Sequence, residues 1–430
     1  MNVYWATRNQ RPNPPISDTQ HSHRPVFYDL AMGFVRLGFV FLACFGVFLY
    51  YGTIRAPRLQ RPWSIIMAVL LTLVILASVA WLVINRTKAN LDAWRPFTAP
   101  TASLLPVILY FGMGLILISL VNAGWSIGQV ATGVGHLEVQ QLIHTSRLVF
   151  VRIATVVALI GAIGVTGYGY HEATNPRLTQ TAVTSTDLPA EFDGFRIALL
   201  SDIHVGVGLG RGFVQSLVQQ VNDAKPDLIV IAGDLSNGSP QQLGDDLLPL
   251  TELKAPYGVL VTTGNHEFDV DGEAWVAWLD GHGLPVLNNS GVVLTRGTAS
   301  IDVLGINDRV GTPPLQPDLQ AAAQQLHDSA GVPVDGAGRF RILIAHEPLQ
   351  VSDGDDLPAK LGVDLQLSGH THGGQIWPIN YLVTLQQPAL DGTHLLDGVT
   401  VVTSRGAGAW GPPIRVGAPP EIPIVTLHRS

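Results

Sequence analysis

The chain has 430 residues, of which 47% are hydrophobic and 13% are charged, with a mean hydropathy of +0.29. This composition is too apolar for an ordinary soluble enzyme and indicates membrane-spanning segments. Residues 1–170 hold 12 of the 25 basic and 4 of the 33 acidic residues, a net charge of +8, which leaves −16 for the remainder. An acidic C-terminal part is not expected to bind nucleic acid, because phosphates repel it. The single cysteine, Cys44, excludes an intrachain disulfide.

The N-terminal part predicts a membrane region. Residues 1–33 are polar and contain several prolines, so a disordered tail is expected there. Four apolar stretches follow, each close to the roughly 20 residues that cross a bilayer, at residues 34–54, 63–84, 102–121 and 148–168. Buried helices of a soluble protein are the alternative, but the second stretch carries no charge between Arg61 and Arg86. We therefore expect a multi-pass protein of the cell membrane with a membrane region over residues 34–170, in which the polar stretch 124–146 lies along the membrane surface.

The orientation of this region depends on its basic loops. Four spans place both ends of the chain on the same side of the membrane. The short loop at residues 55–61 holds three arginines, and Arg147 and Arg152 flank the fourth span, which favours the cytoplasm for these segments. Basic residues on the opposite side weigh against this orientation, namely Arg24, Arg36, Arg86, Lys88 and Arg95. Because short basic loops affect topology most, we expect an extracytoplasmic C-terminal domain.

The C-terminal part predicts an α/β domain. Residues 171–190 are rich in Thr and Ser and are expected to be a linker, followed by a domain at 191–430. Strands are expected at residues 196–200, 228–232, 259–263, 301–306, 341–345, 363–367, 399–403 and 422–427. Helices are expected at 212–222 and from Asp271 onwards. Strand–helix alternation followed mainly by strands predicts two packed mixed sheets with flanking helices.

Five polar segments follow expected strands and carry ligand-type side chains. They are Ser201-Asp202-Ile203-His204, Gly233-Asp234, Gly264-Asn265-His266-Glu267, Ala345-His346-Glu347 and Gly369-His370-Thr371-His372. Carboxylate, imidazole and amide groups suit Zn, Mn or Fe. Taken alone, each segment has a structural explanation, such as a helix cap, a turn or a loop histidine. Their common position after apolar strands favours a metal site, with each His-x-His or Asp-x-His pair on one face of an extended backbone.

The order of these five segments resembles the calcineurin-like metallophosphoesterase superfamily, whose pattern is Asp-x-His, Gly-Asp, Gly-Asn-His-(Asp/Glu), His and Gly-His-x-His. The resemblance covers the chain from about residue 195 to the C-terminus. The closing segments Ser404-Arg405-Gly406-Ala407-Gly408, Pro413-Ile414-Arg415 and Pro420-Glu421-Ile422 are similar to the membrane-associated bacterial branch. That branch includes enzymes similar to UDP-2,3-diacylglucosamine pyrophosphatases and transmembrane metallophosphoesterase-domain proteins.

The resemblance implies a four-layer α/β/β/α sandwich and two divalent metal ions, Mn, Zn or Fe. It implies that one ion is held by Asp202, His204 and His372, the other by Asn265, His346 and His370, with Asp234 bridging. His266 would not be a ligand; it would contact the phosphate and protonate the leaving oxygen.

The expected activity is hydrolysis of a phosphoester or pyrophosphate by metal-bound hydroxide. A membrane anchor favours a lipid-linked or nucleotide-lipid substrate among phosphorylated small molecules. The alternatives are a catalytically silent membrane sensor or scaffold, and a transporter with a soluble appendix. The complete set of ligand-type residues argues against the first alternative. Arg36 and Arg152 are the only charges within the four expected spans, which argues against the second.

Overall fold

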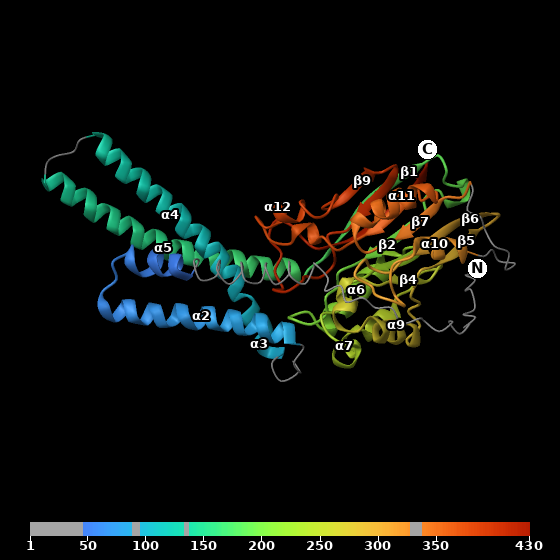
Figure 1. The fold of residues 1–430 in the computed structure, drawn as a ribbon, viewed down its shortest axis with the longest axis horizontal. Helices are drawn as coiled ribbons and strands as arrows, with labels where there is room; N and C mark the ends of the chain where they lie inside the picture. The colour runs from blue at the N-terminus through green and yellow to red at the C-terminus, as the bar shows by residue number, and fades with distance from the viewer. Residues whose placement is uncertain (1–45, 88–94, 133–136, 327–337) are drawn as a thin grey trace, which may run out of the picture. The chain divides into compact units, whose positions relative to one another are not determined.

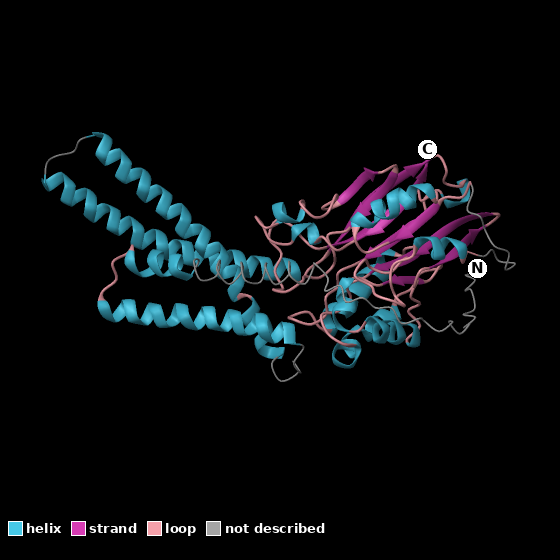
Figure 2. Cartoon of the chain, viewed as in Figure 1, coloured by secondary structure: helices cyan, strands magenta, loops and turns pink. Residues whose placement is uncertain are grey.

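The computed structural model describes residues 46–87, 95–132, 137–326 and 338–430, which fall into two units (Figure 1). The α/β unit contains the chain from Tyr168 to Ser430 together with helix α3 (Arg95–Ala102). The helical unit contains the other described residues. Figure 2 shows helices without strands in the helical unit and both kinds of element in the α/β unit. The expected tail at 1–33 and most of the first expected span at 34–54 lie outside the described residues.

The helical unit contains three long apolar helices among its described residues. They are α2 (Arg61–Thr87), α4 (Leu104–Thr132) and α5 (Leu137–Ala173), preceded by the π-helical turn η1 (Tyr51–Arg55). Three segments are long and apolar enough to cross a membrane: Arg61–Trp81, Phe97–Ala131 and Glu138–Ala173. They overlap the expected spans at 63–84, 102–121 and 148–168.

The described residues of the polar stretch at 124–146 belong to two helices. Helix α4 continues to Thr132 and α5 begins at Leu137, so the stretch forms the ends of two helices. Hydrogen bonds join polar side chains of the two helices: Arg147 of α5 donates to Asn122 Oδ1 at 2.8 Å and to Ser126 Oγ at 2.7 Å in α4. This pairing satisfies the guanidinium of Arg147 between the two helices.

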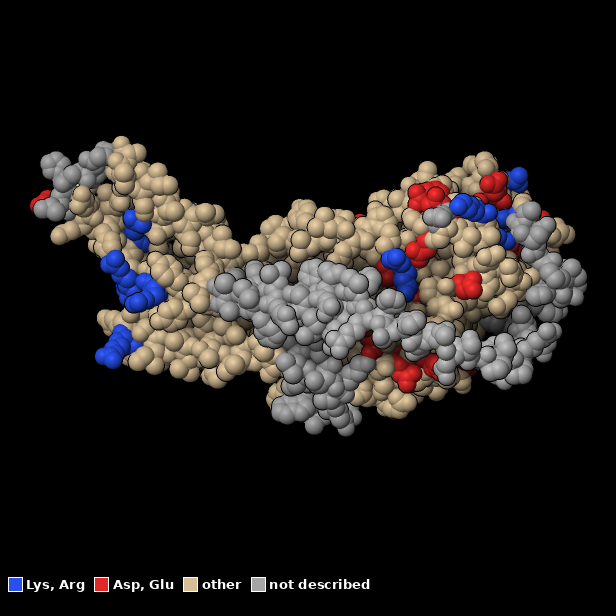
Figure 3. Space-filling view, viewed as in Figure 1, with Lys and Arg blue, Asp and Glu red and all other residues tan. Residues whose placement is uncertain are grey.

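Basic residues of the 55–61 loop and of α5 lie together in the helical unit. Arg152 Nε donates to the carbonyl oxygen of Pro57 at 2.9 Å, and Arg58 Nη1 lies 2.7 Å from His144 Nε2. On the face drawn in Figure 3, the helical unit shows several basic groups and one acidic group at its tip, whereas acidic side chains are spread over the α/β unit. The charge difference expected from the sequence is therefore visible on the surface.

The first sheet of the α/β unit has five strands in the order β1-β11-β2-β3-β4. Strands β2 (Arg196–Leu200), β3 (Leu228–Ala232) and β4 (Val259–Thr262) are parallel neighbours. Strand β11 (Glu421–Arg429) runs antiparallel to β2. The expected positions of these four strands are confirmed to within two residues.

The expected linker at 171–190 contains strand β1 (Arg177–Ser185), which pairs in parallel with β11 over its whole length. Val183 is its only buried residue, because β1 is the edge strand of the sheet. Polar, Thr-rich sequence is compatible with an exposed edge strand, since Thr favours extended backbone. This polarity resembles that of a flexible linker, which explains why the sequence suggested a tether.

The second sheet has six strands in the order β5-β6-β7-β8-β10-β9. Strands β6 (Ala299–Gly305), β7 (Arg341–Ile344), β8 (Leu365–Ser368) and β10 (Val399–Thr403) are parallel neighbours. The edge strands β5 (Ser290–Arg296) and β9 (Gly392–Leu396) are antiparallel to their neighbours and were not expected from the sequence. Strand β9 is almost fully exposed, so it lacks the apolar run that identifies a strand.

Alternating residues of the strands contribute to different buried clusters. Ile197 and Leu199 of β2 share one cluster with Ile342 and Ile344 of β7, so these faces of the two sheets meet. The other face of the first sheet packs against α6 (Arg211–Ala224), α7 (Pro240–Leu247) and α9 (Gly272–Gly281), which lie together in Figure 1. The other face of the second sheet packs against α10 (Leu319–Gln324) and α11 (Asp353–Lys360). The expected mixed sheets with flanking helices are confirmed.

Candidate metal centre

The five polar segments lie at the carboxyl ends of five strands. Segments after β2, β3 and β4 come from the first sheet, and segments after β7 and β8 come from the second. The carboxyl ends of parallel neighbours meet at one edge of a sheet, where ligands bind in open α/β folds. The two sheets therefore bring all eight expected residues to one region, namely Asp202, His204, Asp234, Asn265, His266, His346, His370 and His372.

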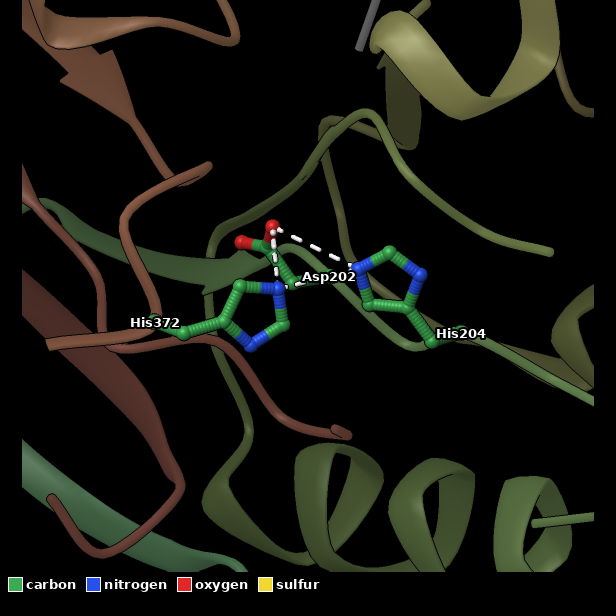
Figure 4. A group of neighbouring side chains, drawn as sticks. All are labelled: Asp202, His204 and His372. Atoms are coloured by element: carbon green, nitrogen blue, oxygen red, sulfur yellow. Dashed lines mark hydrogen bonds and ion pairs between the residues drawn. The ribbon is translucent and has the colours of Figure 1, made fainter. Parts of the chain in front are cut away.

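Asp202, His204 and His372 form a first buried group (Figure 4). His372 Nε2 lies 3.3 Å from Asp202 Oδ1 and 3.0 Å from His204 Nε2, while His204 Nε2 lies 3.9 Å from Asp202 Oδ1. Three potential ligand atoms thus converge within a few ångströms. Carboxylate and imidazole groups arranged in this way can bind a divalent metal ion.

Asp234, His346 and His370 form a second group. His346 Nε2 lies 3.2 Å from Asp234 Oδ2, and His370 Nδ1 lies 3.0 Å from Asn265 Oδ1. The amide oxygen of Asn265 therefore extends this group to four potential ligands. Asp234 also approaches the first group, since its Oδ2 lies 3.6 Å from His204 Nε2. One carboxylate thus contacts imidazoles of both groups.

The backbone that carries these side chains is not extended, so that expectation is wrong. Asp202, His204, Asp234, His370 and His372 all have left-handed φ values, between +48° and +70°. His370 and His372 consequently point to different groups instead of sharing one face. Such conformations cost about 1–3 kcal/mol each and persist where the surrounding structure holds them, which is common at functional sites.

Two glycines allow the loops to pack tightly around the carboxylates. A Cβ atom on Gly264 would lie 2.3 Å from Asp234 Oδ1, and one on Gly369 would lie 2.3 Å from Asp202 Oδ2. Both distances are far below van der Waals contact. Only glycine lets the backbone approach the carboxylates this closely.

The hydrogen bonds of two histidines fit metal ligation. His346 Nδ1 lies 2.7 Å from the carbonyl oxygen of Ala232, and His204 Nδ1 lies 2.9 Å from Asn237 Oδ1. Both oxygens accept, so Nδ1 carries a ring proton and Nε2 is the nitrogen left to bind a cation. His346 Nε2 is buried and has no hydrogen-bond partner, although it faces Asp234. A cation between these two groups would satisfy both.

The acidic surroundings affect the ionisation of His346 and Asp234. Burial lowers the pKa of His346, but the charge and close approach of Asp234 and the charge of Asp202 outweigh burial and raise it well above its usual value. Burial raises the pKa of Asp234, yet the histidines, His346 first, outweigh burial and hold it well below its usual value. Both shifts favour an anionic Asp234 beside a cationic His346.

His266 lies beside both groups and is half-buried. Its ring centroid is 4.6 Å from that of His204 in an edge-on arrangement, and 6.4 Å from that of Trp410. Its backbone N–H donates to Asp234 Oδ1 at 2.8 Å. A nitrogen of its ring, Asp234 and His204 lie close enough together to form a third candidate ligand group. The geometry therefore allows His266 to contact either a metal or a substrate.

Glu267 had no expected role, although this residue belongs to the third polar segment. Its buried carboxylate accepts backbone N–H bonds from Gly264 at 2.7 Å, Leu235 at 2.8 Å and Asp234 at 3.0 Å. Burial, followed by the charge of Asp234, raises the pKa of Glu267 to about 8. Glu267 thus joins the loops after β3 and β4 on the side of Asp234.

Arg415 is a second residue whose role no local pattern indicated. The side chain is fully buried, and it donates from Nη1 to the carbonyl oxygen of His372 at 2.6 Å and from Nε to that of Gly408 at 2.9 Å. Burial lowers the pKa of Arg415 to about 9. It therefore connects the closing segment of the chain to the turn that carries His372.

Comparison with known proteins agrees with this geometry. The family model for calcineurin-like phosphoesterases matches residues 195–374. An uncharacterized metallophosphoesterase of Helicobacter pylori is 34% identical over 282 residues, which are 65% of this chain and 70% of the relative. Another, from Campylobacter jejuni, is 30% identical over 410 residues, 92% of this chain and 99% of the relative.

A transmembrane protein with a metallophosphoesterase domain from Danio rerio is 32% identical over 286 residues, 64% of this chain and 63% of that protein. The chain is therefore also similar to a protein that is named as a transmembrane protein. The strand-end groups, the family match and the nearly full-length similarity to the Campylobacter protein lead to one conclusion: this chain belongs to the calcineurin-like metallophosphoesterases, a family of hydrolases that use divalent metals.

Proposed function

We propose that this chain is a membrane-anchored phosphohydrolase that holds two divalent cations, Mn, Zn or Fe, and cleaves a phosphoester or pyrophosphate bond. The observation that carries the proposal is the position of Asp234, whose Oδ2 lies 3.6 Å from His204 Nε2 and 3.2 Å from His346 Nε2. A carboxylate between two ligand groups is what a two-metal site needs. In the proposal, Asp202, His204 and His372 hold one cation, Asn265, His346 and His370 hold the other, and Asp234 contacts both.

When bound, such cations supply Lewis-acid chemistry: they neutralise phosphate oxygens and acidify water. The protein's own groups orient the ligands. Asn237 and the carbonyl oxygen of Ala232 fix the proton of His204 and His346 at Nδ1, so that each Nε2 faces the centre. Glu267 binds the backbone N–H groups of Gly264 and Asp234, and this holds the loop that carries His266 against the loop that carries Asp234.

We assign to His266 the transfer of a proton to the leaving oxygen. Its imidazole is half-buried beside the two groups. Among the histidines assigned as ligands, His204, His346 and His372 are buried and His370 is partly buried. Histidine is the side chain most often used to transfer a proton near neutral pH. The bond from its backbone N–H to Asp234 Oδ1 fixes its position without using the ring.

The proposed substrate is a phosphate or pyrophosphate linked to a lipid. Helix α5 is a candidate span that ends at Ala173, and β1 begins at Arg177. The four residue steps from Ala173 to Arg177 reach at most about 14 Å, so β1 would be held close to the membrane. We further propose four spans, a four-layer sandwich and an extracytoplasmic α/β unit. Contacts of Arg58 and Arg152 support a common basic end of the helical unit.

A metal-reconstituted activity screen tests the proposal. Full-length protein, stripped of metal and reloaded with Mn, Zn or Fe, is assayed with a phosphomonoester, a phosphodiester and a nucleotide-diphosphate lipid. Metal-dependent hydrolysis of at least one class is expected, with the lipid-linked compound favoured. Correctly folded, metal-loaded protein that hydrolyses none of them would contradict the proposal and favour a silent sensor or scaffold.

A further inference from the structure

The segment that follows the His372 turn is uncharged, and several of its large apolar residues are exposed. No charged residue occurs between Gly373 and Leu390. Within residues 376–385, which include helix α12 (Asn380–Val383), the side chains of Tyr381, Leu382 and Leu385 are 64%, 61% and 80% exposed. Trp377 and Ile379 are exposed as well. We call residues 376–385 the apolar segment. An exposed apolar patch of this kind marks an interaction surface.

The apolar segment is attached to the candidate metal centre. It directly follows the turn His372–Gly374, and a Cβ on Gly374 would lie 2.3 Å from Asn380 Cα, so α12 packs against this turn. The side chain of Gln375 accepts from the backbone N–H of Trp410 at 2.8 Å and donates to its carbonyl oxygen at 2.7 Å. Trp410, itself 55% exposed, is thereby held by the residue that precedes the apolar segment, and its ring lies 6.4 Å from that of His266.

The same segment is joined to the end of α5 through residues 414–416, all within the α/β unit. The backbone N–H of Arg415 donates to the carbonyl oxygen of Gly169 in α5 at 2.9 Å, and a Cβ on Gly169 would lie 2.4 Å from Ile414 Cγ2. On the other side, the backbone N–H of Trp377 donates to the carbonyl oxygen of Val416 at 2.9 Å. Residues 414–416 therefore lie between the last turns of α5 and the first residues of the apolar segment.

We infer that the apolar segment and Trp410 insert into the interfacial layer of the same bilayer that α5 crosses. The segment lies two contacts away from the end of a helix apolar enough to span a membrane. Trp and Tyr prefer the membrane–water interface, and an uncharged surface loses no ionic hydration there. The inference rests on the membrane anchoring proposed above. It brings the His266 side of the metal centre to the level of the lipid phosphates.

Fluorescence quenching by lipid tests the inference without any assay of activity. Full-length protein carrying Cys44→Ser is given one new cysteine, labelled with an environment-sensitive fluorophore and reconstituted into vesicles whose lipids carry a quencher near the headgroup. The test positions are Leu382→Cys and Leu385→Cys. Leu395→Cys on β9 is the matched control, because it is also an exposed leucine, at 73%. Leu120→Cys in α4, 65% exposed and inside a candidate span, reports anchoring.

We expect the labels at 382 and 385 to lose fluorescence in quencher-containing vesicles while the label at 395 keeps it. Quenching at 120 but not at 382 or 385 would overturn the inference and leave the anchoring intact; a segment that faces water or is covered by protein gives this result. Equal quenching at 382, 385 and 395 would also overturn it, because contact would not be specific to the segment. Absence of quenching at 120 as well would contradict both the inference and the anchoring.

Discussion

Arg415 Nη2 lies 2.9 Å from His372 Nδ1 in the fully buried interior beside the metal centre. A guanidinium can only donate, so Nδ1 accepts this bond. The second bond from the same guanidinium, to the carbonyl oxygen of His372, fixes the ring together with its backbone. The ring proton of His372 then lies on Nε2, 3.3 Å from Asp202 Oδ1, and a cation bound by His372 would have to replace this proton. Arg415 thus positions a proposed ligand without being one.

Replacement of Arg415 by lysine should weaken metal binding. Lysine keeps the charge but cannot reproduce the planar fork that reaches His372 and Gly408 together. Loss of a group that orients a ligand typically costs about 10–100-fold in metal affinity. Equilibrium dialysis with elemental analysis measures this, with the exposed Arg211→Lys as control. Unchanged metal affinity in Arg415→Lys would show that His372 needs no such support.

His266→Ala should reduce turnover while leaving the metal content unchanged. A positioned acid typically contributes about 10²–10⁴-fold, and alanine keeps the backbone N–H that donates to Asp234. Kinetics and elemental analysis of the same preparation separate the two roles. The control is His282→Ala at the exposed end of α9. Loss of one metal equivalent in His266→Ala would instead identify His266 as a ligand.

Glu267→Gln should destabilise the fold around the metal centre. The glutamine amide group would direct a donor at backbone N–H groups that now share two carboxylate oxygens. A buried N–H left without an acceptor costs about 1–3 kcal/mol. Urea unfolding of metal-free protein measures the loss, and the exposed Glu273→Gln in α9 is the matched control. Equal stability of the two variants would show that Glu267 does not hold these loops.

The proposed extracytoplasmic position of the α/β unit predicts labelling from outside the cell. Thr186 follows β1 and is exposed, so Thr186→Cys in a Cys44→Ser background carries one accessible thiol. A membrane-impermeant maleimide should label this variant in intact cells. Labelling only after lysis would place the α/β unit in the cytoplasm and show that the basic residues at 86–95 set the orientation.

Much of the α/β unit could be predicted from the sequence because its central strands are buried on both faces. Strands β2 and β3 consist almost entirely of buried apolar residues, and such runs are recognisable without knowledge of the fold. Edge strands β1 and β9 are mostly exposed, so their sequences carry no such run. The pairing of β1 with β11, more than two hundred residues later, is a tertiary effect.

The candidate site could be predicted as a set of residues but not as a geometry. Asp202, Asp234 and His346 each follow a recognisable strand, and the parallel order of the strands brings them together. The left-handed backbone at His370 and His372 could not be foreseen, because it goes with contacts made only in the folded chain. The backbone N–H of His370 donates to Asp202, and Gly369 packs against the same carboxylate. Arg415 reaches His372 only through the path of the closing segment, which leaves no local signal.

The central claim is that Asp234 holds two cations together, and Mn²⁺ titration of metal-free, full-length protein followed by electron paramagnetic resonance tests it most directly. Wild type should bind two Mn²⁺ per chain and give the spectrum of a coupled pair, because metals in such sites lie about 3.5–4 Å apart. Asp234→Asn, which removes the shared negative charge, should lose the coupled spectrum and the metal-dependent hydrolysis. A single uncoupled Mn²⁺ in wild type, or a coupled and active pair in Asp234→Asn, would contradict the two-metal account.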